Sequence, residues 1–441
     1  MYEQDRENQT PNKVRKFKKT NKMKILKTKN GCNYLWFKKT LSFLAKGFTV
    51  TMLLVLSLGC KKANETSQSD QEAASVKTSS SKTSADETWY MAILPDTQYY
   101  TDPGGSHNGT MQMFTNQIDW ILDNRTSLNI QYVAHLGDIT DEGDRSGYDF
   151  QWTNANNQIS RLHDANMPYG LAVGNHDQWC NGDPGSGATN NGYGTRFGKD
   201  RFEGTAPYYS TPQPRKAWYG ANYTTVGSNN NDNHYDLFTV FGQKYLVMYI
   251  EYNEQGSLTN SDYPPDCPNS SSVSPYSSTI ESNVTAWANT IIQANSDRKV
   301  IIVSHSVLSP HKLLPDDGTN AIHNSKHRTI SGQAPDNSYG NFTTQGQKLY
   351  DLIAKPNQNV FMMLGGHITG EGYRVETQNG HVVKAFVSDY QGRSYGGNGY
   401  MRILKFNKTT GTIEIRSIQP LPGTNGEELD ADSKFTVSMY N

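Results

Sequence analysis

The chain is poor in cysteine, in charged residues and in long apolar runs. Only 4 of its 441 residues are cysteines, and 19% are Asp, Glu, Lys or Arg. Its extended apolar stretch, Phe48 to Leu58, is too short for a comfortable membrane span. Hydrophobic residues still make up 35% of the chain, which excludes full disorder and is typical of a globular protein with many loops. The length allows one large domain or up to three smaller ones.

Basic residues are scarce outside the N-terminal segment. Residues 1–59 contain 13 Lys and Arg against 3 Asp and Glu, whereas the rest of the chain contains 28 against 39. Binding to nucleic acid through a general basic surface needs clustered Lys and Arg that neutralise phosphates. The acidic body therefore predicts no stable nucleic-acid partner, although it is compatible with a local metal site.

Residues 1–59 are typical of an export signal. Residues 13–46 are rich in Lys, with Met23 as an alternative start, and Phe48 to Leu58 have the length of a signal-peptide apolar core. This core ends in Leu-Ser-Leu-Gly-Cys60, which resembles a bacterial lipoprotein signal, in which the cysteine is lipidated; a plain cysteine near a cleavage site is the alternative. Residues 60–87 are polar and read as a flexible tether. We expect an exported protein of the bacterial cell envelope, lipid-anchored to a membrane, whose folded domain spans 88–441.

Two cysteines remain in that domain, Cys180 and Cys267. An even pair in an oxidising compartment suggests a disulfide. Two unrelated thiols are the alternative.

Strand-like runs and helical stripes alternate along the body, which predicts an α/β fold. Apolar residues recur with helical spacing over 114–122, 152–162 and 280–291, between the strand-like runs. Residues 178–233 lack a sustained period and read as a long insertion over one end of the sheet. The C-terminal runs 382–387, 400–406 and 412–415 predict consecutive antiparallel strands. The strand-like runs of the body are 89–94, 130–136, 169–173, 245–250, 300–303 and 360–364.

Five of these runs are followed directly by residues that bind metal ions. Since the carboxyl ends of parallel strands meet at one edge of a sheet, side chains far apart in sequence are expected to converge there. Taken singly, each residue is also explained by a turn, a helix cap or a buried imidazole. Their coincidence at successive strand ends predicts a metal centre formed by Asp96, Gln98, Asp138, Asn175, His176, His305 and His367.

The order of these residues resembles the calcineurin-like metallophosphoesterase superfamily. Its motifs are Asp-x-His, Gly-Asp-x-x-Asp, Gly-Asn-His-Asp/Glu, a single His, and Gly-His-x-His. The chain offers Asp96-Thr97-Gln98, Gly137 to Asp141, Gly174 to Asp177, Ser304-His305, and Gly366 to Thr369. The Asp-Thr-Gln form is familiar from secreted bacterial members. The resemblance spans roughly residues 88–420 and implies a four-layered α/β/β/α sandwich.

The resemblance implies two divalent metal ions bridged by Asp138. Asn175, His305 and His367 would complete one site, and Asp96 and Gln98 would belong to the other. In this second site Gln98 and Thr369 replace histidines, which weakens it and favours Mg or Mn over Zn, with Fe or Ca also open. Glu371 is an alternative to Thr369 as a ligand.

The same resemblance implies hydrolysis of phosphate monoesters or diesters by a metal-activated hydroxide. His176 would face the leaving group, and Asp141 would either orient it or cap a turn. Because of Gln98 and Thr369, a non-catalytic surface-exposed binding lipoprotein on the same fold is the alternative. The residues expected to line the substrate cleft are Tyr99, Tyr100, His323, His327, Arg374 and Arg393.

Overall fold

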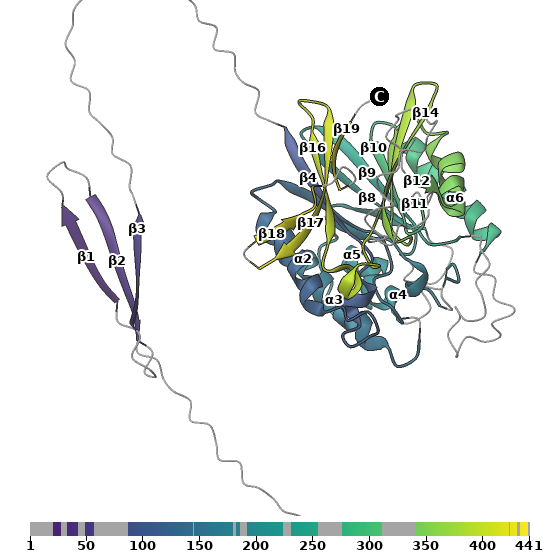
Figure 1. The fold of residues 1–441 in the computed structure, drawn as a ribbon. Helices are drawn as coiled ribbons and strands as arrows, with labels where there is room; N and C mark the ends of the chain where they lie inside the picture. Colours follow the sequence, from purple (N-terminus) through teal and green to yellow (C-terminus); the bar gives the residue numbers. More distant parts are fainter. Residues whose placement is uncertain are drawn as a thin grey trace, which may run out of the picture. The chain divides into compact units, whose positions relative to one another are not determined.

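A computed structural model of the chain shows two seven-stranded sheets in the region from residue 87 onward (Figure 1). Before residue 87, the structure describes the backbone of three strands alone. The described residues are 21–27, 33–42, 49–56, 87–143, 145–179, 182–185, 192–223, 231–254, 276–310, 340–422, 424–429 and 433–439.

The first sheet has the strand order β18-β17-β16-β4-β5-β6, with β19 paired to β17. Strands β4, β5 and β6 are parallel to one another, whereas β16 runs antiparallel to β4. Its strands are β4 (Thr88–Leu94), β5 (Ile130–His135), β6 (Tyr169–Leu171), β16 (Met401–Asn407), β17 (Thr412–Leu421), β18 (Thr424–Glu427) and β19 (Lys434–Ser438).

The second sheet has the order β14-β15-β13-β10-β9-β8-β7. Strands β15, β13, β10 and β9 are parallel, and β14 and β8 are antiparallel to their neighbours. Its strands are β7 (Tyr219–Asn222), β8 (His234–Val240), β9 (Gln243–Ile250), β10 (Lys299–Ser304), β13 (Val360–Gly365), β14 (Gly370–Gln378) and β15 (His381–Asp389). A short ladder of β11 (Leu308–Pro310) and β12 (Gly340–Phe342) stands apart from both sheets.

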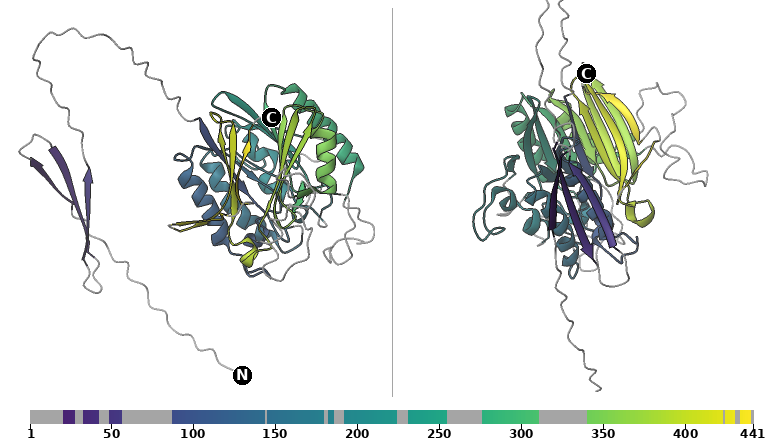
Figure 2. Two further views of the ribbon diagram at one scale, coloured as in Figure 1. Left: turned by 45° about the horizontal axis from the view of Figure 1, so that its top comes forward. Right: turned by 90° about the vertical axis from the view of Figure 1, so that its left-hand side faces the viewer.

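Helices cover the outer face of each sheet. The first sheet packs against α2 (Met111–Asn124) and α3 (Asp149–Asp164), and the second against α6 (Ser278–Ala294), α8 (Thr344–Leu349) and the π-helical turn η3 (Tyr350–Ala354) (Figures 1 and 2). Shorter helical segments are α1 (Gln98–Thr101), η1 (Asn175–Asp177), α4 (Tyr193–Phe197), α5 (Lys199–Glu203) and α9 (Ser394–Gly397).

The alternation of apolar residues along β4 shows how the layers are held together. Tyr90, Ala92 and Leu94 face the helices, whereas Trp89, Met91 and Ile93 pack between the two sheets. Successive side chains of a strand point to opposite faces, so a strand apolar on both faces must lie between two layers. The predicted α/β/β/α sandwich is therefore confirmed.

Two predictions about the sheets were wrong. The run 382–387 was expected to continue into an antiparallel series with the two runs after it, but it forms β15, which pairs in parallel with β13 in the second sheet. Residues 178–233 were expected to be an insertion over one end of the sheet. Instead, described parts of this segment contribute Phe197, Phe202 and Trp218 to the core of the first sheet, and β7 to the edge of the second.

The N-terminal unit, considered separately, contains β1 (Asn21–Lys27), β2 (Asn33–Ser42) and β3 (Thr49–Leu56), which form an antiparallel sheet. Among the described residues, no helix combines the length and apolarity that crossing a bilayer requires. Cys60, Cys180 and Cys267 lie outside the described residues, so the lipidation site and the disulfide stay predictions.

His163 makes the stability of the fold dependent on pH. Its two ring nitrogens contact the hydroxyls of Tyr169 (3.1 Å) and Tyr209 (2.8 Å). Burial and the nearby Arg201 and Lys216 lower its pKa from 6.5 to about 2. The folded protein keeps the ring neutral while the unfolded chain protonates it below about pH 6.5, so this contribution to stability is lost as the pH falls.

Replacement of His163 by phenylalanine tests this effect. The difference in unfolding free energy between wild type and His163→Phe should shrink by about 1.4 kcal/mol between about pH 7.5 and pH 5.5. Denaturant titrations of both proteins across this range measure the difference. Parallel stability curves would show that the ring is protonated in the fold as easily as in the unfolded chain.

Candidate metal centre

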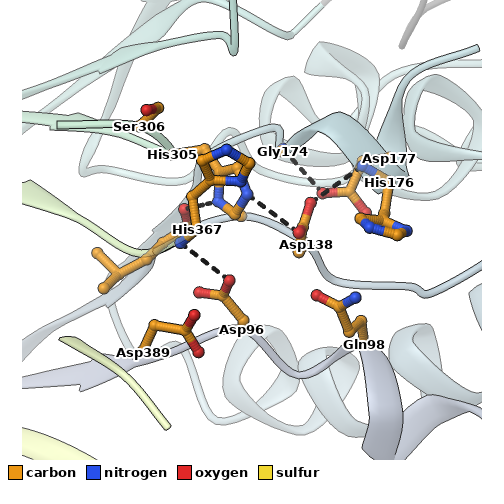
Figure 3. Close-up of polar contacts among 12 residues, drawn as sticks. Asp96, Gln98, Asp138, Gly174, His176, Asp177, His305, Ser306, His367 and Asp389 are labelled. Atoms are coloured by element: carbon orange, nitrogen blue, oxygen red, sulfur yellow. Dashed lines mark hydrogen bonds and ion pairs between the residues drawn. The ribbon is translucent and has the colours of Figure 1, made fainter. Parts of the chain in front are cut away.

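The residues predicted from the strand ends gather at the carboxyl edges of both sheets (Figure 3). Asp96 follows β4 and Asp138 follows β5, so the first sheet supplies both carboxylates. His305 follows β10 and His367 follows β13, so the second sheet supplies both imidazoles. Ligand atoms of Asp138, His305 and His367 all lie within 4.8 Å of one another, which is close enough for them to share one metal ion.

The ring of His305 is oriented for metal binding. Its Nδ1 lies 2.9 Å from the carbonyl oxygen of Leu136, so this nitrogen carries the hydrogen and donates it. The other nitrogen, Nε2, lies 3.0 Å from Oδ2 of Asp138, and both side chains are buried. In the neutral ring two lone pairs therefore face each other, an arrangement that a proton or a metal ion between or beside them stabilises.

The charges of these side chains respond strongly to one another. Burial raises the pKa of Asp138, but His305 and His176 lower it more, so the net pKa lies below its ordinary value. Burial lowers the pKa of His305, and the charge of Asp138 outweighs this effect and raises it. Burial and the neighbouring His305 lower the pKa of His367 to about 3. Asp138 is thus ionised and His367 neutral at neutral pH, the states in which both bind metal ions.

A second group of oxygens lies beside the first. Oδ2 of Asp96 accepts a hydrogen bond from the backbone N–H of His367 at 3.0 Å, whereas its Oδ1 is buried with no hydrogen-bond donor among the described residues. Oε1 of Gln98 is likewise buried with no hydrogen-bond donor among the described residues. Buried acceptors are nearly always satisfied in folded proteins, so these two atoms call for a cation.

The amide of Gln98 is fixed in one orientation by Asp141. Its Nε2 donates to Oδ1 of Asp141 at 3.1 Å, and a carboxylate accepts but does not donate. The carbonyl oxygen is consequently turned to the side where Asp96 and Asp138 lie (Figure 3). Gln98 thus presents an oxygen where the family motif has an imidazole nitrogen.

Two glycines allow the carboxylates to approach the backbone this closely. A Cβ on Gly174 would lie 2.1 Å from Oδ1 of Asp138, and a Cβ on Gly366 would lie 2.1 Å from Oδ1 of Asp96. Any larger residue at either position would displace a carboxylate. The glycines of the Gly-Asn-His-Asp and Gly-His motifs therefore serve the site through their lack of a side chain.

Asn175 and His176 enter the site from η1, after β6. The backbone N–H of His176 donates to Oδ1 of Asp138 at 3.0 Å, and Asn175 is buried in the same turn. Asp177, the last residue of this motif, accepts hydrogen bonds from the backbone N–H groups of Ile139, Thr140 and Gly174. Asp177 thus ties the loop after β6 to the loop after β5.

His176 is held by the main chain of Asp141 more closely than by its carboxylate. Its Nδ1 lies 2.5 Å from the carbonyl oxygen of Asp141 and 3.6 Å from Oδ1 of the same residue. The side chain of His176 is 31% exposed, so solvent reaches it. Asp141 therefore orients two side chains. Its backbone carbonyl holds the ring of His176, and its carboxylate holds the amide of Gln98.

Glu371 does not take the place of Thr369. Its buried carboxylate accepts hydrogen bonds from Arg402 (2.7 Å), Tyr390 (2.8 Å) and Ser433 (2.9 Å). This network of polar groups stabilises the first sheet against the second, and a carboxylate in an ion pair with a buried arginine is not available to a metal ion.

The expected cleft residues have other contacts. Tyr100 is buried in the core, and its hydroxyl accepts from the backbone N–H of Gly399 at 3.0 Å. Arg374 pairs with Glu376, and Arg393 pairs with Glu428, so neither is presented to a phosphate. His323 and His327 lie outside the described residues.

Tyr99 keeps its predicted place beside the site. Burial, and the carboxylates of Asp141, Asp138, Asp389 and Asp96, raise the pKa of its hydroxyl above the ordinary value. Its ring stacks on that of His107, with centroids 3.6 Å apart.

Sequence reasoning assigned no role in the site to two residues that lie in it. The ring of Tyr252, which follows β9, lies edge-on to both His305 and His367, with centroids 5.9 and 5.2 Å away. Asp389, the last residue of β15, lies beside Asp96 (Figure 3). Both residues lie at strand ends, as the predicted ligands do. Asp389 was not counted among the ligands because the run 382–387 was assigned to an antiparallel series.

Comparisons with known proteins show what the chain is similar to. YvnB, an uncharacterized protein of Bacillus subtilis, is 28% identical over 334 residues, which are 74% of this chain and 19% of that protein. The chain thus spans about a fifth of this relative's length. The crystal structure of a dimetal phosphatase from Danio rerio covers 80% of this chain and 99% of its own, at 11% identity and a TM-score of 0.42. The profile of the calcineurin-like phosphoesterase family matches residues 92–368, which is more than half of the chain and includes Asp96, Asp138, Asn175, His305 and His367. The chain therefore belongs to the calcineurin-like phosphoesterase family.

Proposed function

We propose that this protein hydrolyses phosphate monoesters or diesters with the help of two divalent metal ions. The observation that carries the proposal is the meeting of Asp138, His305 and His367 within 4.8 Å, next to the unsatisfied oxygens of Asp96 and Gln98. Membership of the phosphoesterase family supports it.

The donor set fits two metal ions of different character. Asp138, Asn175, His305 and His367 would hold one ion with mixed oxygen and nitrogen donors. Asp96, Gln98 and the shared Asp138 would hold the other with oxygens alone, which suits Mn or Mg better than Zn. When bound, such ions neutralise the charge of the ester oxygens and make hydroxide available near neutral pH.

The protein's own groups complete the chemistry. Gly174 and Gly366 leave space for the carboxylates, and Asp177 fixes the loops that carry Asp138 and Asn175. His176, whose Nδ1 is directed to the carbonyl of Asp141, would use its Nε2 to protonate the leaving oxygen. The acidic surface of the protein does not oppose an anionic substrate, because two dications dominate the local field.

Activity measurements on the full chain test the proposal. The purified protein, stripped with a chelator, is assayed with nitrophenyl phosphate and bis-nitrophenyl phosphate after addition of Mn, Mg, Zn, Fe or Ca. We expect hydrolysis of at least one ester that the chelator abolishes and a metal restores. Stoichiometric metal binding without turnover of either ester would contradict the proposal and favour a non-catalytic binding protein.

We also propose that the protein is exported and anchored to a membrane through a lipid on Cys60. The Lys-rich segment, the short apolar core and the position of Cys60 after Gly59 support this. Labelling of producing bacteria with palmitate should mark the wild type and leave Cys60→Ala unmarked. Equal labelling of both proteins would refute the anchor, and a protein that stays inside the cell would refute export.

A further inference from the structure

The structure assigns a ligand that the family pattern lacks: we propose that Asp389 binds the second metal ion together with Asp96, Gln98 and Asp138. In the motif Gly-His-x-His the last position supplies an imidazole, and this chain has Thr369 there. The inference rests on the metal-dependent function proposed above.

Strand register brings Asp389 next to the segment that lacks the imidazole. Strand β14 pairs antiparallel with β15, and Gly370 lies directly opposite Asp389. Asp389 is therefore the cross-strand neighbour of the residue that follows Thr369. Its carboxylate lies beside that of Asp96, the residue that shares the second site with Gln98 (Figure 3).

The carboxylate of Asp389 is also held in a fixed orientation. Its Oδ1 accepts from the backbone N–H of Gln391, and its Oδ2 accepts from Nε2 of the same residue, both at 2.8 Å. That Nε2 lies 3.3 Å from the carbonyl oxygen of His367, which ties Asp389 to the loop that carries a ligand of the first ion. Each oxygen keeps a second lone pair for a cation.

The neighbouring side chains present unsatisfied oxygens to the same space. Asp96, Gln98 and Asp389 are 2%, 1% and 1% exposed, and Oδ1 of Asp96 and Oε1 of Gln98 have no hydrogen-bond donor among the described residues. Figure 3 shows the carboxylate of Asp389 beside that of Asp96, with the carbonyl oxygen of Gln98 facing them.

The resulting site has oxygen donors only. Three carboxylates and one amide suit a hard ion such as Mn, Mg or Ca, whereas an imidazole in place of Asp389 would increase the affinity for Zn. Asp389 thus supplies the donor that Thr369 does not, and it adds a negative charge to the site.

Metal binding by the full-length protein tests the assignment. Equilibrium dialysis against increasing Mn²⁺, with bound metal counted by mass spectrometry, should give two equivalents for the wild type. For Asp389→Asn we expect one equivalent to bind as before and the other at least about tenfold more weakly. The matched control Thr369→Ala should retain both. Unchanged binding by Asp389→Asn, or equal losses in both variants, would overturn the proposal.

Thermal unfolding separates a ligand from a structural residue. Without metal, Asp389→Asn should be at least as stable as the wild type, because one of several gathered negative charges is removed. With Mn²⁺, its gain in melting temperature should be smaller than that of the wild type. A variant that is strongly destabilised without metal would show that Asp389 acts through its turn with Gln391, and would overturn the proposal.

A double variant offers a rescue. Adding Thr369→His to Asp389→Asn should recover the second equivalent and shift its preference from Mn²⁺ toward Zn²⁺. Failure of the wild type to hydrolyse any ester while Asp389→Asn loses one Mn²⁺ would contradict the proposed function and leave this inference intact. An active enzyme in which Asp389→Asn binds both ions normally would support the proposed function and overturn this inference.

Discussion

Replacing His305 with alanine is expected to remove one metal ion and to lower phosphoester hydrolysis by roughly 10³-fold. His305 is buried, its Nδ1 is committed to the carbonyl of Leu136, and its Nε2 is directed at Asp138. Alanine would remove one of the three ligand atoms that lie within 4.8 Å of one another, at the end of β10 (Lys299–Ser304). Metal content by mass spectrometry and kcat/KM for the preferred ester measure the two effects.

A second buried histidine provides the control for this experiment. His381 is the first residue of β15, so it lies at the opposite end of this strand from Asp389. Its side chain is buried, with 4% exposed, and its Nε2 contacts the carbonyl oxygen of Val360 at 2.6 Å. His381→Ala also removes a buried imidazole, but we expect it to keep both metal ions and most of the activity. Equal rates in wild type and His305→Ala would refute the metal centre as described.

Replacing His176 with alanine should lower kcat by about 10²–10⁴-fold for alkyl phosphate esters while both metal ions stay bound. The ring contacts the carbonyl of Asp141 through Nδ1, and the backbone N–H of His176 donates to Asp138. An alkoxide needs a proton in order to leave, whereas a nitrophenolate departs without one. The loss should therefore be much smaller for nitrophenyl esters.

The dependence on pH gives a second measurement for the same variant. If His176 donates a proton, we expect kcat of the wild type to decrease at high pH and this decrease to disappear in His176→Ala. Asp141→Asn should cause a smaller loss, because the carbonyl oxygen that holds the ring is unchanged. Equal losses for alkyl and nitrophenyl esters, or loss of metal from His176→Ala, would show that the ring does not act as the acid.

The candidate site could be predicted largely from local sequence. Asp138 and His305 each follow a short run of Val, Ile, Ala or Tyr that reads as a buried strand, and the carboxyl ends of parallel strands meet at one edge of a sheet. The two glycines beside the carboxylates, Gly174 and Gly366, could also be identified from the sequence, because each belongs to a short motif. This is why residues about 270 positions apart were expected to converge.

The failures share a physical cause. Arg393 and Glu371 carry the charges expected of a phosphate clamp and a metal ligand, but both belong to a buried network with Glu428 and Arg402. Side-chain type does not reveal which partner lies opposite, since that depends on how β14 and β16 come together across long stretches of chain.

The sequence by itself determined the layered α/β architecture, the order of the motifs and the identity of most donor atoms, because periodicity and strand-end chemistry are local properties. Only the tertiary structure decided that β15 (His381–Asp389) runs parallel to β13 (Val360–Gly365) and antiparallel to β14 (Gly370–Gln378). That pairing places Asp389 opposite Gly370, next to Thr369, which supplies no imidazole. Strand pairing is set by packing between segments distant in sequence, so a ligand contributed in this way becomes visible once the sheets are assembled.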